Sequence, residues 1–267
     1  MLIFVGLGLS IKHLNIEAME ALRSADKIVV DSYTNIVPDF SVSELKKIIG
    51  GDKVIIVAKR RDLEGESVNR IVMEAKKKNI AILVPGDPFI ATTHDAIRLE
   101  ALENGVPVKV IHNVSIYSVA PSAIGLQAYR FGKTVTLVYP TYFKPLSTIE
   151  TIYDNLSRNL HTLLLLDLKL EENIAMTIPE AIEIILDLDR KGALGKILAV
   201  GVAQAGTNNQ YLKADRLANL ANYEYPQPPH SIVIVAKPHP IELDMLYRNA
   251  GLPESLYKEY SLKKEYP

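Results

Sequence analysis

The chain has 267 residues, of which 48% are hydrophobic and 23% are charged, as in an ordinary globular protein of one large or two smaller domains. It contains no cysteine, which excludes disulfide bonds, thiolate catalysis and cysteine-ligated zinc or iron–sulfur clusters. The formal net charge of -1 excludes a global positive field that would attract nucleic acid.

No apolar stretch approaches the roughly 18 residues of a membrane span. The chain starts directly as a predicted strand, MLIFVGLG, without a basic segment or a cleavage site, so we expect no secretory signal. We therefore expect a cytoplasmic protein that binds neither nucleic acid nor a membrane.

The first half alternates predicted strands and helices. Short runs of branched apolar residues indicate buried strands, and the helices between them are supported by a cap at Asn15 and a stop at Gly105. The predicted strands are Leu2–Val5, Lys27–Val30, Lys53–Val57, Ile80–Val84 and Val108–Ile111, and the predicted helices are Asn15–Ser24, 41–49, 66–78 and 92–104.

The second half repeats this alternation. Its predicted strands are Thr134–Tyr139, Thr162–Leu166, Ile197–Ala203 and Ser231–Val235, and its predicted helices start at Ile178 and near residue 240. Thr177 and Glu180 form the sequence pattern of a capping box before the first of these helices. The polar segment 112–118 is the predicted boundary between two α/β domains, 1–112 and 113–267, with mostly parallel sheets. The cleft between two such halves is the expected ligand site.

The segment 83–97, LVPGDPFIATTHDAI, contains a sharp turn after a predicted buried strand. Pro85 and Gly86 end that strand at its carboxyl end, where open α/β sheets bind their ligands. Asp87 has two interpretations at this stage. It caps the next helix, since Asp is a favoured N-cap, or it contacts a ligand.

The loop Gly6-Leu7-Gly8 has part of a dinucleotide-binding fingerprint. That fingerprint requires a third glycine where this chain has Ile11, and a helix that begins at the loop. The first helix cap is Asn15, well downstream, and no Walker A sequence is present. The glycines therefore favour a tight strand exit with close backbone approach over an NAD site.

Several polar residues keep a structural and a functional interpretation. His230 opens a strand and is a structural residue or a ligand contact, and Asp167 is a strand-exit cap or a ligand contact. His94 lies at a helix start, where Thr92 or Thr93 is the expected cap.

Blocks spread over nearly the whole chain resemble the class III, tetrapyrrole-type S-adenosylmethionine-dependent methyltransferases. The blocks are VGLGL (5–9), ADKIVVDSYT (25–34), PGDPFIATTH (85–94), NVSIYS (113–118), LHTLLLLDLK (160–169), VAQAGTNN (202–209) and PPHSIVIV (228–235). Within that superfamily the resemblance is closest to the diphthine synthases. Tetrapyrrole enzymes usually continue the first motif as GxGxGD, whereas this chain has Leu9-Ser10, which argues against a porphyrinoid substrate.

This resemblance implies a tetrapyrrole methylase-like fold, a homodimer, and S-adenosylmethionine bound in the interdomain cleft and released as S-adenosylhomocysteine. The sequence contains no HExxH motif or carboxylate cluster, so we expect no metal site. We assign no catalytic residue. The implied cofactor-binding residues are Leu9, Asp87, Ile90, Ser115, Ile116, Leu166, Ala205 and His230.

The resemblance also implies a reaction in diphthamide biosynthesis, in an archaeal or eukaryotic organism, and the compact chain favours an archaeal one. The amine of a 3-amino-3-carboxypropyl-histidine on translation elongation factor 2 is methylated repeatedly, which gives diphthine. In-line displacement requires alignment of the reactants and exclusion of water rather than a nucleophilic triad. Two alternatives stay open, a tetrapyrrole or rRNA methyltransferase of the same superfamily and a non-catalytic nucleotide-binding module that uses NAD.

Overall fold

The structure, a computed structural model, describes residues 1–141 and 143–262. These residues form two compact units, one of Met1–Ile116 with Leu168–Ile174 and one of Tyr117–Asp167 with the chain from Ala175 onward. The first unit thus extends beyond the expected boundary at residue 112. Hydrogen bonds from the Asn113 side chain to the carbonyl groups of Gly6 and His13 hold the segment after residue 112 against this unit.

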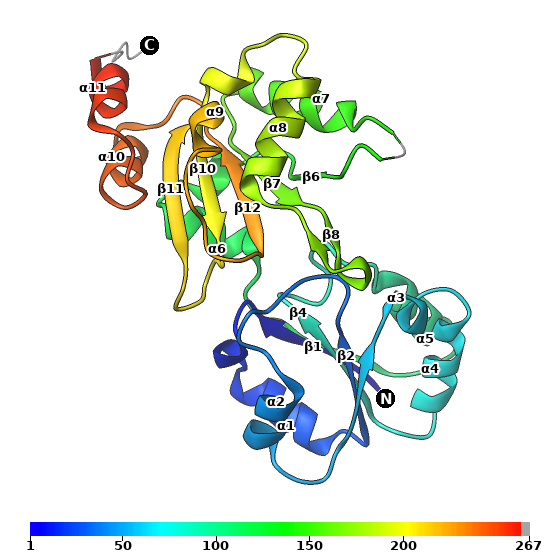
Figure 1. The fold of residues 1–267 in the computed structure, drawn as a ribbon. Helices are drawn as coiled ribbons and strands as arrows, with labels where there is room; N and C mark the ends of the chain where they lie inside the picture. Colours follow the sequence, from blue (N-terminus) through cyan, green and yellow to red (C-terminus); the bar gives the residue numbers. More distant parts are fainter. Residues whose placement is uncertain (142, 263–267) are drawn as a thin grey trace. The chain divides into compact units, whose positions relative to one another are not determined.

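The first unit is a parallel sheet with helices on both faces (Figure 1). The strand order is β3-β2-β4-β1-β5, and every neighbouring pair is parallel, as expected. Its strands are β1 (Leu2–Gly8), β2 (Lys27–Asp31), β3 (Val54–Ala58), β4 (Ile80–Pro85) and β5 (Val108–Ile111). Its helices are α1 (Ile16–Ser24), α2 (Val42–Ile49), α3 (Arg60–Leu63), α4 (Ser67–Ala75) and α5 (Asp95–Glu103), with a 3₁₀ turn η1 (Ile11–His13).

The central strands β1 and β4 are buried on both faces, which explains their continuous apolar runs. Successive side chains of a strand point to opposite faces. Ile3 and Val5 therefore pack with α1 and α2, while Leu2 and Phe4 pack with α4 and α5. Because this sheet is parallel, the carboxyl ends of its strands, and the loops that follow them, lie at one edge.

The second unit has a different sheet, of order β11-β10-β12-β7-β6. In the part of the chain that the structure describes, β6 and β7 are parallel, whereas β7–β12, β12–β10 and β10–β11 are antiparallel pairs. The expectation of a mostly parallel sheet is therefore wrong for this unit. The short turn 204–210 joins β10 to a strand that the sequence analysis did not predict, β11 (Tyr211–Arg216), and a connection that short makes an antiparallel hairpin.

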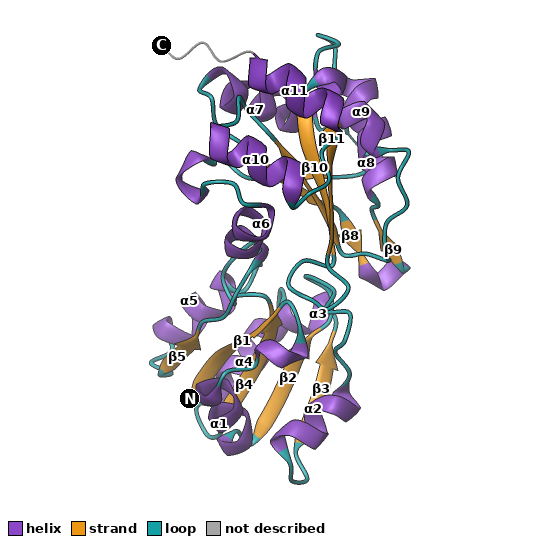
Figure 2. Ribbon diagram, turned by 90° about the vertical axis from the view of Figure 1, so that its left-hand side faces the viewer, coloured by secondary structure: helices purple, strands orange, loops and turns teal. Residues whose placement is uncertain are grey.

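Helices α7, α8 and α9 cover one face of this sheet, and α6 and α10 lie on the other side (Figure 2). The remaining strands are β6 (Val135–Leu137), β7 (Thr162–Leu166), β8 (Leu168–Lys169), β9 (Ile174–Ala175), β10 (Leu198–Ala203) and β12 (His230–Ile234). The helices are α6 (Ile116–Ile124), α7 (Leu146–Ser157), α8 (Ile178–Leu188), α9 (Leu217–Leu220), α10 (Pro240–Arg248) and α11 (Glu254–Leu262), with 3₁₀ turns η2 (Ala128–Arg130), η3 (Leu170–Glu172) and η4 (Leu194–Lys196). None of these described helices combines the length and the hydrophobicity that a bilayer crossing requires.

Two local expectations have opposite outcomes. The capping box at the start of α8 is confirmed, because the Thr177 and Glu180 side chains each bond the other residue's backbone N–H. The polar segment 112–118, the predicted domain boundary, is partly helical, because α6 begins at Ile116. Ala120 and Ile124 of α6, four positions apart and fully buried, give the helical spacing, and they lie beyond the segment 112–118.

A buried carboxylate holds several segments of the second unit together. The Glu242 side chain, on α10, is fully buried and forms an ion pair with Arg130. It also accepts hydrogen bonds from His161 Nε2 at 3.2 Å and from the backbone N–H of Gln127 and His239 at 2.9 and 2.7 Å. Burial by itself raises the pKa of Glu242, but these hydrogen bonds outweigh it and lower the pKa to about 2.

We expect this carboxylate to make folding acid-sensitive. Its folded pKa of about 2 lies below the ordinary 4.5, so its contribution to the free energy of unfolding is complete above pH 4.5 and lost as the pH falls toward 2. Glu242→Gln should flatten the fall in unfolding free energy over this window, measured by urea titration at several pH values. The exposed Glu183→Gln variant is the control, and an unchanged slope in Glu242→Gln would contradict this account.

Candidate functional site

Two strand exits meet at the carboxyl edge of the first sheet. Beyond the parallel pairing of β1 with β4, Gly8 and Gly86 exchange backbone hydrogen bonds of 3.0 and 2.9 Å. Both glycines have positive φ, 78° and 72°, a conformation that other residues adopt at a cost. A Cβ on Gly6 would lie 2.7 Å from Asn113 Cβ, so this glycine permits a close approach. The tight strand exit expected here is confirmed.

Asp87 follows this glycine pair and does not cap the next helix, because α5 begins only at Asp95. Its Oδ2 accepts hydrogen bonds from His112 Nδ1 at 2.8 Å and from the backbone N–H of Asn113 at 3.1 Å. The Asp87 side chain is mostly buried, whereas that of His112 is 72% exposed. The carboxylate therefore ties the Pro-Gly-Asp-Pro turn to the segment that leads out of the first unit.

Five of the expected site residues belong to the first unit. A Cβ on Gly86 would meet only Ser115, at 3.9 Å, so Leu9, Asp87 and Ser115 lie around the same glycine pair. Leu9 is buried, and its N–H donates to His13 Nδ1 at 3.1 Å. Ile90 is 38% exposed, and its N–H donates to the Asp87 carbonyl, while Ile116 begins α6.

The other three lie at one edge of the second sheet. Ser231 pairs with Leu165 in the antiparallel β12–β7 register, and one step further that register places His230 opposite Leu166. His230 also pairs with Ala203 at the end of β10, just before Ala205. Leu166, Ala205 and His230 thus come together from three separate segments.

Both ring nitrogens of His230 are occupied. Nε2 donates to the Pro226 carbonyl at 2.6 Å, and Nδ1 accepts the first backbone N–H of α8, from Ile178, at 3.3 Å. Burial lowers the pKa of His230 despite the opposing hydrogen bond to Pro226. The imidazole is therefore neutral and fixed in one tautomer, and it can offer a ligand only its ring face or its backbone.

The sequence analysis missed Gln204, which precedes Ala205. Its backbone has a positive φ of 48°, its N–H donates to the Pro229 carbonyl at 2.9 Å, and Nε2 donates to the Gln227 carbonyl at 2.8 Å. The side-chain oxygen Oε1 is buried and has no hydrogen-bond partner among the described residues. An unpartnered buried acceptor is costly, so this carbonyl is available to a donor group of a ligand. Only its place beside Ala205 could have indicated it.

Asp167 and His94 have structural contacts. Asp167 Oδ2 accepts the Tyr139 N–H at 3.2 Å, consistent with a strand-exit cap. His94 is fully buried, with Nδ1 3.3 Å from the Pro88 carbonyl and Nε2 3.4 Å from Asp31 Oδ2. Thr92 donates to the same Pro88 carbonyl and caps no helix, contrary to the expectation, because the helix starts three residues later.

Within residues 1–141 and 143–262, no three His, Asp or Glu side chains are placed to hold a metal ion together. The arrangement offers backbone groups, apolar side chains and a few neutral acceptors in each unit. Such a set suits a ligand without phosphate groups.

Comparisons with known proteins agree on one family. The sequence profile of the tetrapyrrole (corrin/porphyrin) methylases matches residues 1–221. The chain is 67% identical to the diphthine synthase of Staphylothermus marinus over all of both chains. It is 35% identical to the diphthine methyl ester synthase of Saccharomyces cerevisiae, over 100% of this chain and 95% of that one. A crystal structure of a diphthine synthase, 37% identical, superposes with a TM-score of 0.86 over 96% of this chain and 98% of that one.

A methyl group added at Gly86 tests whether a ligand approaches the glycine pair. Gly86→Ala should lose at least about tenfold in affinity for S-adenosylhomocysteine, measured by calorimetry, because its Cβ would project into open space beside Ser115. Gly105→Ala is the matched control, with a similar positive φ of 67° and nothing within 4 Å of its Cβ. Equal affinities in the two variants would show that the space at Gly86 is not used.

Proposed function

Because the chain belongs to the diphthine synthases within the tetrapyrrole methylase family, we propose that it transfers methyl groups from S-adenosylmethionine to translation elongation factor 2. It is thus a methyltransferase of diphthamide biosynthesis. The family relationship over the full chain carries this proposal. The residues that the sequence analysis expected to bind the methyl donor fall into two groups, one at a single edge of each sheet. We propose that both groups contact the same donor molecule.

The residues fit this donor. S-adenosylmethionine has no phosphate, so it needs no glycine-rich loop at a helix N-terminus, and the loop after β1 leads into a 3₁₀ turn rather than a helix. Its ribose hydroxyls and adenine amine are donors, and the unpartnered Oε1 of Gln204 is an acceptor that one of them would satisfy. Gly86 permits close approach to the backbone, and Leu9, Ile90 and Leu166 supply apolar surface.

When bound, S-adenosylmethionine supplies a methyl group on a positively charged sulfur. The chain's part is to align that group with the acceptor amine and to exclude water, which accounts for much of the rate in a reaction of this type. The amine loses one proton in each round, and we assign that proton to solvent, because we identify no base among the expected site residues. His230 is excluded as a base because both of its ring nitrogens are hydrogen-bonded.

We propose three methyl groups as the end point, which gives the trimethylammonium of diphthine. The name of the yeast relative, a diphthine methyl ester synthase, points to a second candidate end point in which a carboxylate is methylated as well. The 67% identical relative is named a diphthine synthase, which favours the first. We also propose a homodimer and a cytoplasmic reaction, in keeping with a substrate of the translation machinery.

Mass spectrometry of the acceptor tests the proposed reaction. Elongation factor 2 that carries the 3-amino-3-carboxypropyl-histidine is incubated with the protein and S-adenosylmethionine. We expect a gain of three methyl groups on the peptide that contains this histidine. A fourth, base-labile methyl group would favour the methyl ester, and an unmodified peptide from a competent substrate would overturn the proposal.

Loss of the Asp87 carboxylate should abolish binding of S-adenosylhomocysteine while the fold stays intact. Asp87→Ala frees the backbone N–H of Asn113 and the His112 ring, so the turn beside Gly86 loses its tie. Calorimetry measures the affinity, and circular dichroism monitors the fold. The exposed Asp52→Ala variant is the control, and normal affinity in Asp87→Ala would remove this residue from the site.

A further inference from the structure

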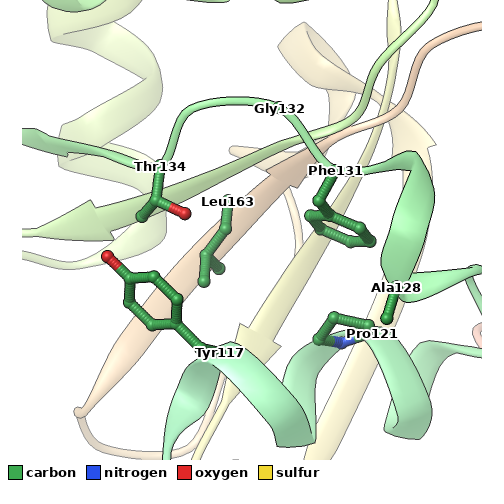
Figure 3. A pocket seen from close by; sticks show the side chains of 7 residues that line it. All are labelled: Tyr117, Pro121, Ala128, Phe131, Gly132, Thr134 and Leu163. Atoms are coloured by element: carbon green, nitrogen blue, oxygen red, sulfur yellow. The ribbon is translucent and has the colours of Figure 1, made fainter. Parts of the chain in front are cut away.

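The second unit contains a cavity of about 290 Å³ that none of the expected site residues lines. Figure 3 shows the ring of Tyr117 on one side, the ring of Phe131 on the other, and Leu163 between them. Its lining residues come from α6, from the segment 128–134 and from β7, and they are Tyr117, Pro121, Ala128, Phe131, Gly132, Thr134 and Leu163.

The lining favours a particular kind of ligand. No lining side chain is charged, so an anion would lose its hydration here without gaining a partner. Aromatic faces attract cations, and aromatic cages recognise quaternary ammonium groups in particular. The methyl groups of such an ion donate no strong hydrogen bonds, so an apolar wall such as Leu163 suits them. The hydroxyls of Tyr117 and Thr134 add partially negative oxygens at one side (Figure 3).

The Phe131 wall is held from two sides. On one side the Phe131 ring packs against His161 with ring centres 5.3 Å apart, and His161 in turn donates to the buried Glu242. On the other side, Asn155 exchanges hydrogen bonds of 3.1 and 2.9 Å with the backbone of Lys133. A Cβ on Gly132 would lie only 2.2 Å from Asn155 Oδ1, so a side chain at this position would collide with the Asn155 amide. The wall is therefore fixed before a ligand binds, which lowers the entropic cost of binding.

The cavity also adjoins residues of the proposed donor site along the chain. Tyr117 directly follows Ser115 and Ile116. Leu163 lies on β7 three positions before Leu166, about 10 Å along the strand. The cavity and the proposed donor site thus share two stretches of chain, residues 115–117 and β7, although the side chains of Leu163 and Leu166 point to opposite faces of the sheet.

We infer that this cavity is the acceptor subsite, in which the Tyr117 and Phe131 rings hold the methylated ammonium of the acceptor side chain between rounds of transfer. The inference rests on the proposed function, since repeated methylation yields that ammonium. The cavity performs no chemistry itself. It retains a partly methylated side chain, so that the next round begins before the protein substrate dissociates.

Tetramethylammonium is a direct probe that requires no catalysis. Its titration into the isotope-labelled protein should shift the aromatic NMR signals of Tyr117 and Phe131. Phe131→Leu keeps an apolar side chain but removes the ring, and it should weaken binding about tenfold. Phe131→Tyr restores a ring and should retain binding. Tyr129→Leu removes an 81% exposed ring that lies outside the lining and is the matched control.

The distribution of methyl groups tests the subsite in the reaction. Phe131→Leu should accumulate peptides with one and two methyl groups, whereas the unaltered protein and Tyr129→Leu should accumulate the trimethylated form. Equal affinity of each variant for S-adenosylhomocysteine shows that the donor site is intact. No methylation by the unaltered protein would overturn the proposed function. Normal trimethylation by Phe131→Leu, together with no signal shifts from tetramethylammonium, would overturn the acceptor subsite alone.

Discussion

The pairing of Gly8 with Gly86 is the constraint on which the first unit's site depends. Two backbone hydrogen bonds continue the contact between β1 and β4 past the end of the sheet, and both residues need a positive φ to do so. This brings the loop after β1 beside the Pro-Gly-Asp-Pro turn. The Asp87 carboxylate then fixes the backbone of Asn113, so the exit from the first unit is bound to the same edge. The positions of Leu9, Asp87 and Ser115 beside the glycine pair follow from these few bonds.

The second unit reaches a comparable result by different means. Antiparallel pairing places His230 between Leu166 and Ala203, and the buried carboxylate of Glu242 fixes the chain around residues 127–131 and 161. Charged and polar groups are thus used here to position apolar surface. The Phe131 ring is the clearest case, because it packs on a histidine whose own proton is held by Glu242.

How much was predictable from the sequence depends on whether the signal was local. The parallel strands of the first unit and the capping box of Thr177 have local patterns, and both were predicted. The antiparallel second sheet was not, because β11 is half-exposed and its pairing with β10 is a matter of tertiary structure. The expected site residues came from a family resemblance, and the structure shows which of them meet within each unit.

Some site features had no sequence signal at all. Neither the orphaned oxygen of Gln204 nor the occupied nitrogens of His230 can be read from residue order, since they depend on the carbonyl groups of Pro226 and Gln227. These features change the expected chemistry. The two hydrogen bonds of the His230 ring exclude it as a base, and the unpartnered Oε1 of Gln204 is an additional acceptor. The cavity between Tyr117 and Phe131 likewise depends on packing among distant segments.

A crystal structure of the complex with S-adenosylhomocysteine would show whether residues of both units bind one donor molecule, as we propose. We expect contacts with Gly86 and Ser115 from the first unit and with Ala205 and Leu166 from the second. We also expect a hydrogen-bond donor of the ligand at Gln204 Oε1. A ligand bound by only one unit, with Gln204 Oε1 still unpartnered, would contradict this proposal.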